Sequence, residues 1–206
     1  MSIKIRKASA KDTLFLAQMI LQSSRAGKKR GLFDFLFSDC DEKGILQNIQ
    51  ALTKTNAKSY CHFENFSIAE MDGKSVGTLC SYEPRISTKQ TFIDALSELG
   101  YDDVADNLEP IYGCNFELNK RTLMFDFMEE LDGFIDVGVL KALMQKSLLT
   151  ARLKGYRIAQ SIVEIGSLDT IMYYKKLGFK EIEHKECESY KEKFGRAGFI
   201  LFSIEF

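Results

Sequence analysis

The run Tyr173-Tyr174-Lys175-Lys176-Leu177-Gly178-Phe179 decides the fold of this 206-residue chain. It stands near the end of a predicted passage made of a strand over residues 157–165, a helix over 169–177 and a strand over 179–185. A strand, a helix and another strand in close succession are typical of an α/β protein.

The rest of the chain is predicted to combine strands and helices in a similar way. Residues 3–8 alternate polar and apolar side chains as a strand does, and the cap-like residues 9–12 precede a helix. The other expected elements are a helix over about 41–53, a hairpin over 66–82 with its turn at 71–74, a strand over 122–130, a helix over 139–154 that ends at Gly155, and a last strand over 198–206.

Residues 84–121 form an insertion-like region with a predicted helical stretch over about 88–108. With 45% hydrophobic and 12% aromatic residues, a chain of this length can bury a full core as one domain. We therefore expect a single domain over residues 1–206 with a helical insertion at about 84–121.

This order of elements, together with the run at 173–179, resembles the GCN5-related N-acetyltransferase family and its Y-x-K-L-G-F signature. The resemblance covers nearly the whole chain. It implies an α/β protein with the acyl-CoA N-acyltransferase-like fold, in which helices flank a mixed, splayed central sheet. It also implies transfer of an acetyl or short acyl group from an acyl-CoA to an amine of a small molecule or protein.

Tyr174 matches the tyrosine of the family signature, whose hydroxyl lies beside the sulfur of acetyl-CoA and can act as the acid. Tyr173 faces elsewhere, because neighbouring helix positions differ by about 100°. A tyrosine in an amphipathic helix usually packs with its hydroxyl at the surface. The complete run favours the functional role for Tyr174.

The resemblance also implies where the coenzyme binds. In the family, backbone N–H groups at the start of a helix hold the pyrophosphate, since a helix N-terminus presents free donors and a positive dipole end. The matching loop is Ile135-Asp136-Val137-Gly138-Val139-Leu140, before the Lys141-Ala142-Leu143-Met144 run. The expected coenzyme-binding residues are Met128, Glu130, Asp136, Val137, Gly138, Val139, Leu140 and Ser167. For Ser167, capping of the following helix is the alternative role.

The loop departs from the family pattern R/Q-x-x-G-x-G/A at several positions. Ile135 replaces a basic or amide side chain, Asp136 adds a carboxylate, and Leu140 adds bulk where the backbone should come close. Like charges about 5 Å apart repel by roughly 3 kcal/mol at an effective dielectric constant of about 20. The alternative function is therefore a non-catalytic ligand-sensing or protein-interaction domain with weakened CoA binding.

Candidates for the catalytic base come from the predicted strand over 122–130. Because side chains alternate along a strand, Asp126, Met128 and Glu130 are expected on one face. Acids on a half-buried strand face are uncommon without a partner, so Asp126 and Glu130 join Tyr174 as predicted catalytic residues. A shift in register would bring Glu129 into the role, and a water-linked Glu164 is a further alternative.

Composition excludes several classes of protein. The net charge of −1, from 28 basic and 29 acidic residues, favours neither nucleic acid nor a membrane surface as a partner. The N-terminus has no apolar signal core, and no eighteen apolar residues run together, so we expect a soluble cytoplasmic protein. The expected partner is an amine-bearing acceptor, and an exposed C-terminal strand over 199–206 could pair across a homodimer.

Metal and disulfide chemistry are not expected. The chain has two histidines and no H-E-x-x-H or C-x-x-C motif, which argues against a metal site. An odd number of cysteines, widely spaced, is typical of free thiols in a reducing compartment. They are Cys40, Cys61, Cys80, Cys114 and Cys187.

Overall fold

The computed structural model describes residues 2–102, 104–118 and 122–206. The strands in these ranges are β1 (Lys4–Lys7), β2 (Phe66–Met71), β3 (Lys74–Tyr82), β4 (Leu123–Glu130), β5 (Ile158–Glu164), β6 (Lys180–Glu186) and β7 (Gly198–Glu205). The α-helices are α1 (Thr13–Arg25), α2 (Leu32–Leu36), α3 (Glu42–Leu52), α4 (Lys89–Ser97), α5 (Val104–Tyr112), α6 (Val139–Leu153), α7 (Leu168–Lys176) and α8 (Glu188–Phe194). Within the described residues, no helix is both long and apolar enough to cross a membrane.

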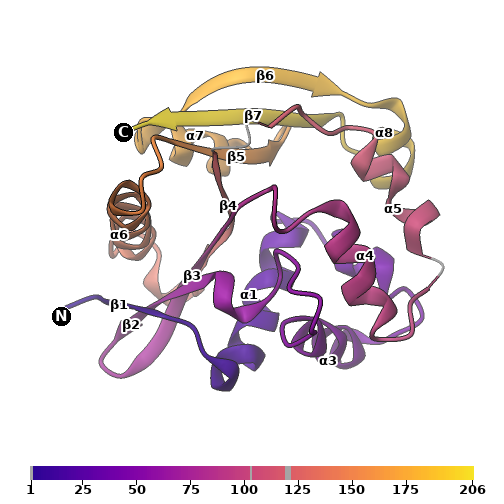
Figure 1. Cartoon of the computed structure of the whole chain (residues 1–206), viewed down its shortest axis with the longest axis horizontal. Coiled ribbons are helices and arrows are strands. Elements are labelled where there is room, and N and C mark those ends of the chain that lie inside the picture. Colours follow the sequence, from indigo (N-terminus) through magenta and orange to yellow (C-terminus); the bar gives the residue numbers. More distant parts are fainter. Residues whose placement is uncertain (1, 103, 119–121) are drawn as a thin grey trace.

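One sheet joins the strands in the order β1-β2-β3-β4-β5-β7-β6. Neighbouring strands are antiparallel except β4 and β5, which are parallel. These two pair only at Leu123 with Ala159 and Met124 with Gln160, and then diverge. Figure 1 shows the resulting opening, with β5, β7 and β6 in one half and β1, β2 and β3 in the other. The expected mixed, splayed sheet is confirmed.

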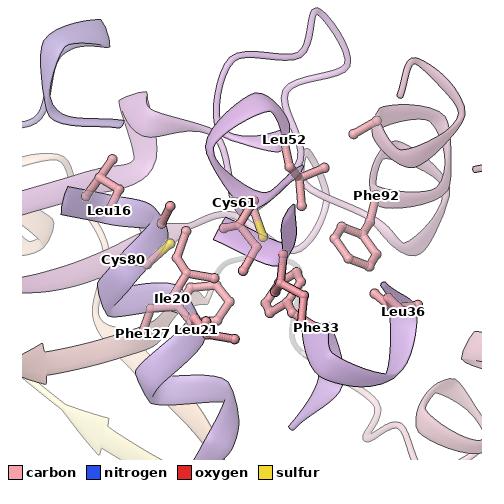
Figure 2. Close-up of a cluster of buried hydrophobic side chains, with 14 of the residues drawn as sticks. Leu16, Ile20, Leu21, Phe33, Leu36, Leu52, Cys61, Cys80, Phe92 and Phe127 are labelled. Carbon is pink, nitrogen blue, oxygen red and sulfur yellow. The ribbon is translucent and has the colours of Figure 1, made fainter. Parts of the chain in front are cut away.

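Helices cover both faces of the sheet. Helices α1 to α5 pack on one face, where Phe33, Phe92 and Phe127 belong to a cluster of buried side chains that converge between the helices and the sheet (Figure 2). Helices α6 and α7 pack on the other face, where Phe125 and Phe202 are buried. Strand β4 contributes to both clusters, with Phe127 on the first face and Phe125 on the second.

The predicted strands and the long helices are confirmed within a few residues, but the insertion differs. The expected single helical stretch over 88–108 is wrong, because α4 and α5 are separate helices. Gly100 has φ +84°, and the N–H of Tyr101 donates to the carbonyl of Leu96, which closes α4 in the glycine-based manner common at helix ends. Residues 103 and 119–121 of the predicted insertion lie outside the described residues. Helices α2 and α8 were not predicted.

The expectation that Asp126, Met128 and Glu130 share one face of β4 is wrong. Asp126 pairs with Cys80 and Glu129 with Thr78, so two residues of β4 lie opposite Leu79 alone. This is a β-bulge, and Phe127 within it has φ +44°. The extra residue reverses the alternation, so Asp126 and Glu129 share a face while Glu130 points to the other, toward α6.

The expectation of free thiols is wrong for two of the five cysteines. Cys114, after α5, and Cys187, before α8, form a disulfide with a Cα–Cα distance of 5.9 Å. They are 73 residues apart in sequence, and only the packing of α5 against α8 brings them together (Figure 1). Cys40, Cys61 and Cys80 are free.

Candidate active site

A cavity of about 290 Å³ lies where β4 and β5 diverge. The end of α1, the ends of β3 and α5, and helices α7 and α8 complete its walls. Among the described residues, none pairs with β4 beyond Met124 on its β5 side, so its backbone polar groups there are available to a bound molecule. The splayed sheet thus creates a site that a continuous sheet would close.

Tyr174 lines this cavity from α7. Its ring stacks on Phe202 at a centroid distance of 5.8 Å and meets the edge of Phe179 at 5.0 Å. Burial raises the pKa of Tyr174 far above its usual value, and the nearby hydroxyl of Ser161 opposes that rise only in part. The hydroxyl therefore remains protonated and can act as a proton donor. Tyr173 does not line the cavity.

Asp126 lines the cavity from β4. Burial raises its pKa to about 6, although the backbone N–H of Phe127 donates to its carboxylate at 2.7 Å. Burial raises the pKa of Tyr60 and Tyr82 well above the usual value, and the nearby charge of Asp126 adds to the rise. Asp126 thus lies in the wall of the cavity formed by the strand opening.

Glu129 reaches the same cavity because of the β-bulge. Burial raises its pKa to about 7, and Gln22 donates to the carboxylate through Nε2 at 3.1 Å. The charges of Asp126 and Glu129 both raise the pKa of Tyr174, so the three groups are within electrostatic reach of one another. Strand alternation could not reveal this position, because the bulge has no recognisable sequence signal.

Glu164, the other alternative for the base, is already engaged. Arg196 forms an ion pair with its carboxylate, and the hydroxyl of Tyr190 donates to it. These two partners occupy both oxygens of the carboxylate. Glu164 is therefore better suited to fixing the cavity wall than to proton transfer.

Glu130 lies apart from the cavity, at the N-terminus of α6. Burial raises its pKa, the facing N–H of Leu140 lowers it, and the charge of Asp136 raises it further. Its Oε2 is buried without a hydrogen-bond partner among the described residues. A carboxylate near a helix N-terminus is stabilised by the free N–H groups and the helix dipole.

The loop before α6 has a backbone suited to binding an anion, but the carboxylate of Glu130 already lies at this position. Gly138 caps the helix with φ +93°, and Asp136 adopts φ +64°. Ile135 and Val137 are exposed, at 57% and 47%. Backbone N–H groups at this helix start fit a pyrophosphate, yet Glu130 already faces the N–H of Leu140.

The remaining predicted coenzyme-binding residues differ in their positions. Val139 is fully buried against Gly77, where an added Cβ would come within 2.6 Å of its Cγ1. Met128 and Ser167 both line the cavity. Ser167 holds the position before α7 without a side-chain cap hydrogen bond, so the capping role proposed for it is not observed.

Of the tyrosines in the cavity wall that were not predicted, three come from segments far from α7 and α8 in the sequence. Tyr60 precedes β2, Tyr82 ends β3, and Tyr112 ends α5. The rings of Tyr60 and Tyr82 are 5.6 Å apart. These residues are separated in sequence and match no motif, so only the fold identifies them as neighbours.

No protein-family model matches the sequence, and neither does any curated protein. Solved structures do resemble it. One acetyltransferase is 14% identical with a TM-score of 0.70, over 98% of each chain. A GCN5-related N-acetyltransferase from Kribbella flavida is 15% identical with a TM-score of 0.59, over 99% of this chain and 98% of that chain. The PaiA N-acetyltransferase from Thermoplasma acidophilum, in complex with coenzyme A, is 12% identical with a TM-score of 0.56, over the whole of both chains.

At these identities the similarity concerns the fold. The chain has the fold of the GCN5-related N-acetyltransferases. The family expected from the run at 173–179 is therefore the one whose fold the structure adopts.

Proposed function

We propose that this protein is an N-acetyltransferase that moves an acetyl or another short acyl group from an acyl-CoA to an amine of a small molecule or protein. One observation carries the proposal: the cavity between β4 and β5 places Tyr174 within electrostatic reach of the carboxyl groups of Asp126 and Glu129. Amide formation from a thioester needs a base for the amine and an acid for the thiolate. The acetyltransferase of similar fold that binds coenzyme A supports an acyl-CoA as donor.

Glu129 is the preferred base, since its pKa of about 7 suits proton transfer at neutral pH. It removes a proton from the bound ammonium, and the free amine attacks the thioester carbonyl carbon. The new C–N bond forms, the C–S bond breaks, and Tyr174 donates its proton to the departing thiolate. The positively charged nitrogen formed by the attack then releases its second proton, which restores the one on Tyr174, and solvent takes the proton from Glu129.

The pH dependence of kcat/KM, measured with one fixed amine, should follow the ionisation of Glu129. Because only the carboxylate accepts a proton, activity is expected to fall as the pH drops below about 7. Glu129→Gln should remove this inflection and lower kcat/KM by about 100-fold or more. Glu183→Gln on exposed β6 is the control, and it should keep both the pH inflection and the native kcat/KM. An unchanged inflection in Glu129→Gln would assign the base elsewhere, first to Asp126.

Titration calorimetry with acetyl-CoA and free CoA tests the donor site. Glu130→Gln should tighten binding about tenfold or more, because like charges about 5 Å apart repel by roughly 3 kcal/mol at an effective dielectric constant of about 20. The gain should shrink as the pH falls, since burial raises the pKa of Glu130 and the native side chain then becomes neutral more readily. Weaker binding of CoA by Glu130→Gln would mean that the native carboxylate contributes to CoA binding instead of opposing it.

The second candidate function is a non-catalytic domain of the same fold that senses a ligand or binds a protein, with weakened CoA affinity. Its specific support is Glu130, whose carboxylate faces the helix start where a pyrophosphate would bind. If neither the native chain nor Glu130→Gln binds CoA or acetylates any amine, this second candidate replaces the first.

A further inference from the structure

Every charged side chain among the described residues that line the cavity is acidic. Among the described residues that line it, Asp126, Glu129 and Glu164 carry carboxylates and none carries a basic side chain. Arg196 approaches from outside and neutralises Glu164. Asp126 and Glu129 have neutral hydrogen-bond donors and no ion pair within the described part of the chain. Two carboxylates in one cavity without a positively charged partner favour the binding of a cation.

Aromatic rings share the cavity wall with Asp126, whose charge reaches Tyr60 and Tyr82. Tyr60 stacks on Phe92 at 4.7 Å, and its ring is 5.6 Å from that of Tyr82. Within the described part of the chain, the buried hydroxyl of Tyr112 has no hydrogen bond of normal geometry. Burial raises its pKa, and nearby Tyr60 lowers it in part. Ring faces beside a carboxylate attract an ammonium group through both the π-system and the charge.

The two carboxylates are separated along the strand. Asp126 pairs with Cys80 and Glu129 with Thr78, two residues apart on β3. At about 3.4 Å per residue, the backbone positions are roughly 7 Å apart. Two sites for positive charge at this spacing match the two ends of a short aliphatic chain.

We propose that the acceptor is a short aliphatic diamine, with one nitrogen at Glu129 and the other, as ammonium, at Asp126 among Tyr60, Tyr82 and Tyr112. This inference rests on the proposed acetyl transfer for its chemistry but not for its binding site. The nitrogen at Glu129 loses a proton, attacks the acyl carbon and becomes the amide. The other nitrogen keeps its proton and leaves with the product.

Binding of the amine alone tests the inference. Calorimetry on the full chain at pH 8, in physiological salt and without CoA, compares 1,4-diaminobutane with butylamine. The diamine should bind about tenfold tighter or more, because the monoamine leaves Asp126 unpaired. Asp126→Asn should bind the two amines equally, whereas Asp72→Asn, which removes the same charge at the distant β2–β3 turn, should keep the preference.

Asp126→Asn is expected to fold. The folded-state pKa of Asp126 is raised, so its ionisation at pH 8 opposes folding, and the neutral amide removes that cost. Thermal unfolding checks this point. Tyr82→Leu gives an independent readout, since loss of the ring should weaken diamine binding several-fold.

The outcomes separate the two proposals. Equal affinity of the native chain for diamine and monoamine overturns the inference, whether or not acetyl transfer occurs. Diamine preference without acetylation of the diamine supports the binding site and overturns the proposed function. Acetylation of both amines with the same kcat/KM supports the proposed function and overturns the inference.

Discussion

Tyr174→Phe should lower kcat for acetyl transfer by about 100-fold or more while leaving the Kd for acetyl-CoA within about twofold. General acid catalysis by a positioned side chain typically contributes about 10²–10⁴-fold, and the substitution removes only the hydroxyl. The ring contacts with Phe202 and Phe179 remain, so the core of the C-terminal half should keep its packing. Steady-state kinetics and calorimetry on the same samples separate the rate effect from binding.

Tyr156→Phe is the matched control, because Tyr156 lies two residues before β5, outside the lining of the cavity. It should change kcat less than about threefold. If Tyr174→Phe also changes kcat that little, the thiolate leaves without an acid from α7. The family signature at 173–179 would then describe packing rather than catalysis.

Cys114→Ser should destabilise the protein by about 4 kcal/mol under non-reducing conditions. The disulfide links residues 73 positions apart, and closing a loop of this length restricts the unfolded chain by that order of free energy. It also fastens the end of α5 to the start of α8, and Cys114 itself lines the cavity. Urea unfolding of the native chain and of Cys114→Ser measures the difference.

Two controls define this result. Reduction of the native chain should bring its stability to that of Cys114→Ser, and Cys40→Ser, which removes a free thiol, should have an effect under about 1 kcal/mol. Thiol titration of the denatured, unreduced protein should find three thiols, matching Cys40, Cys61 and Cys80. Five thiols would mean that Cys114 and Cys187 stay reduced.

Local patterns were sufficient to predict much of the fold. The strand pattern at residues 3–8, the turn at 71–74 and the helix ending at Gly155 all reflect short-range rules of side-chain alternation and capping, and β1, the β2–β3 hairpin and α6 follow them. The insertion was harder, because whether 88–108 forms one helix or two depended on the closing hydrogen bond from Tyr101 to Leu96.

The candidate site was predicted only where a motif named it. The signature identified Tyr174, and the acidic strand identified Asp126 together with Glu129 as an alternative. The aromatic wall of Tyr60, Tyr82 and Tyr112 had no signal, because its members come from three separate segments that meet only after folding.

The sequence by itself determined the order of strands and helices, the resemblance to an acetyltransferase family and the presence of acids near the expected strand opening. Tertiary structure decided which of the acidic side chains of β4 face the cavity. The two-to-one pairing of β4 with β3 turns Glu129 into the cavity and Glu130 toward α6. Such a bulge depends on the pairing of two strands about 50 residues apart and on helices packed against both faces, which no local alternation of residues encodes.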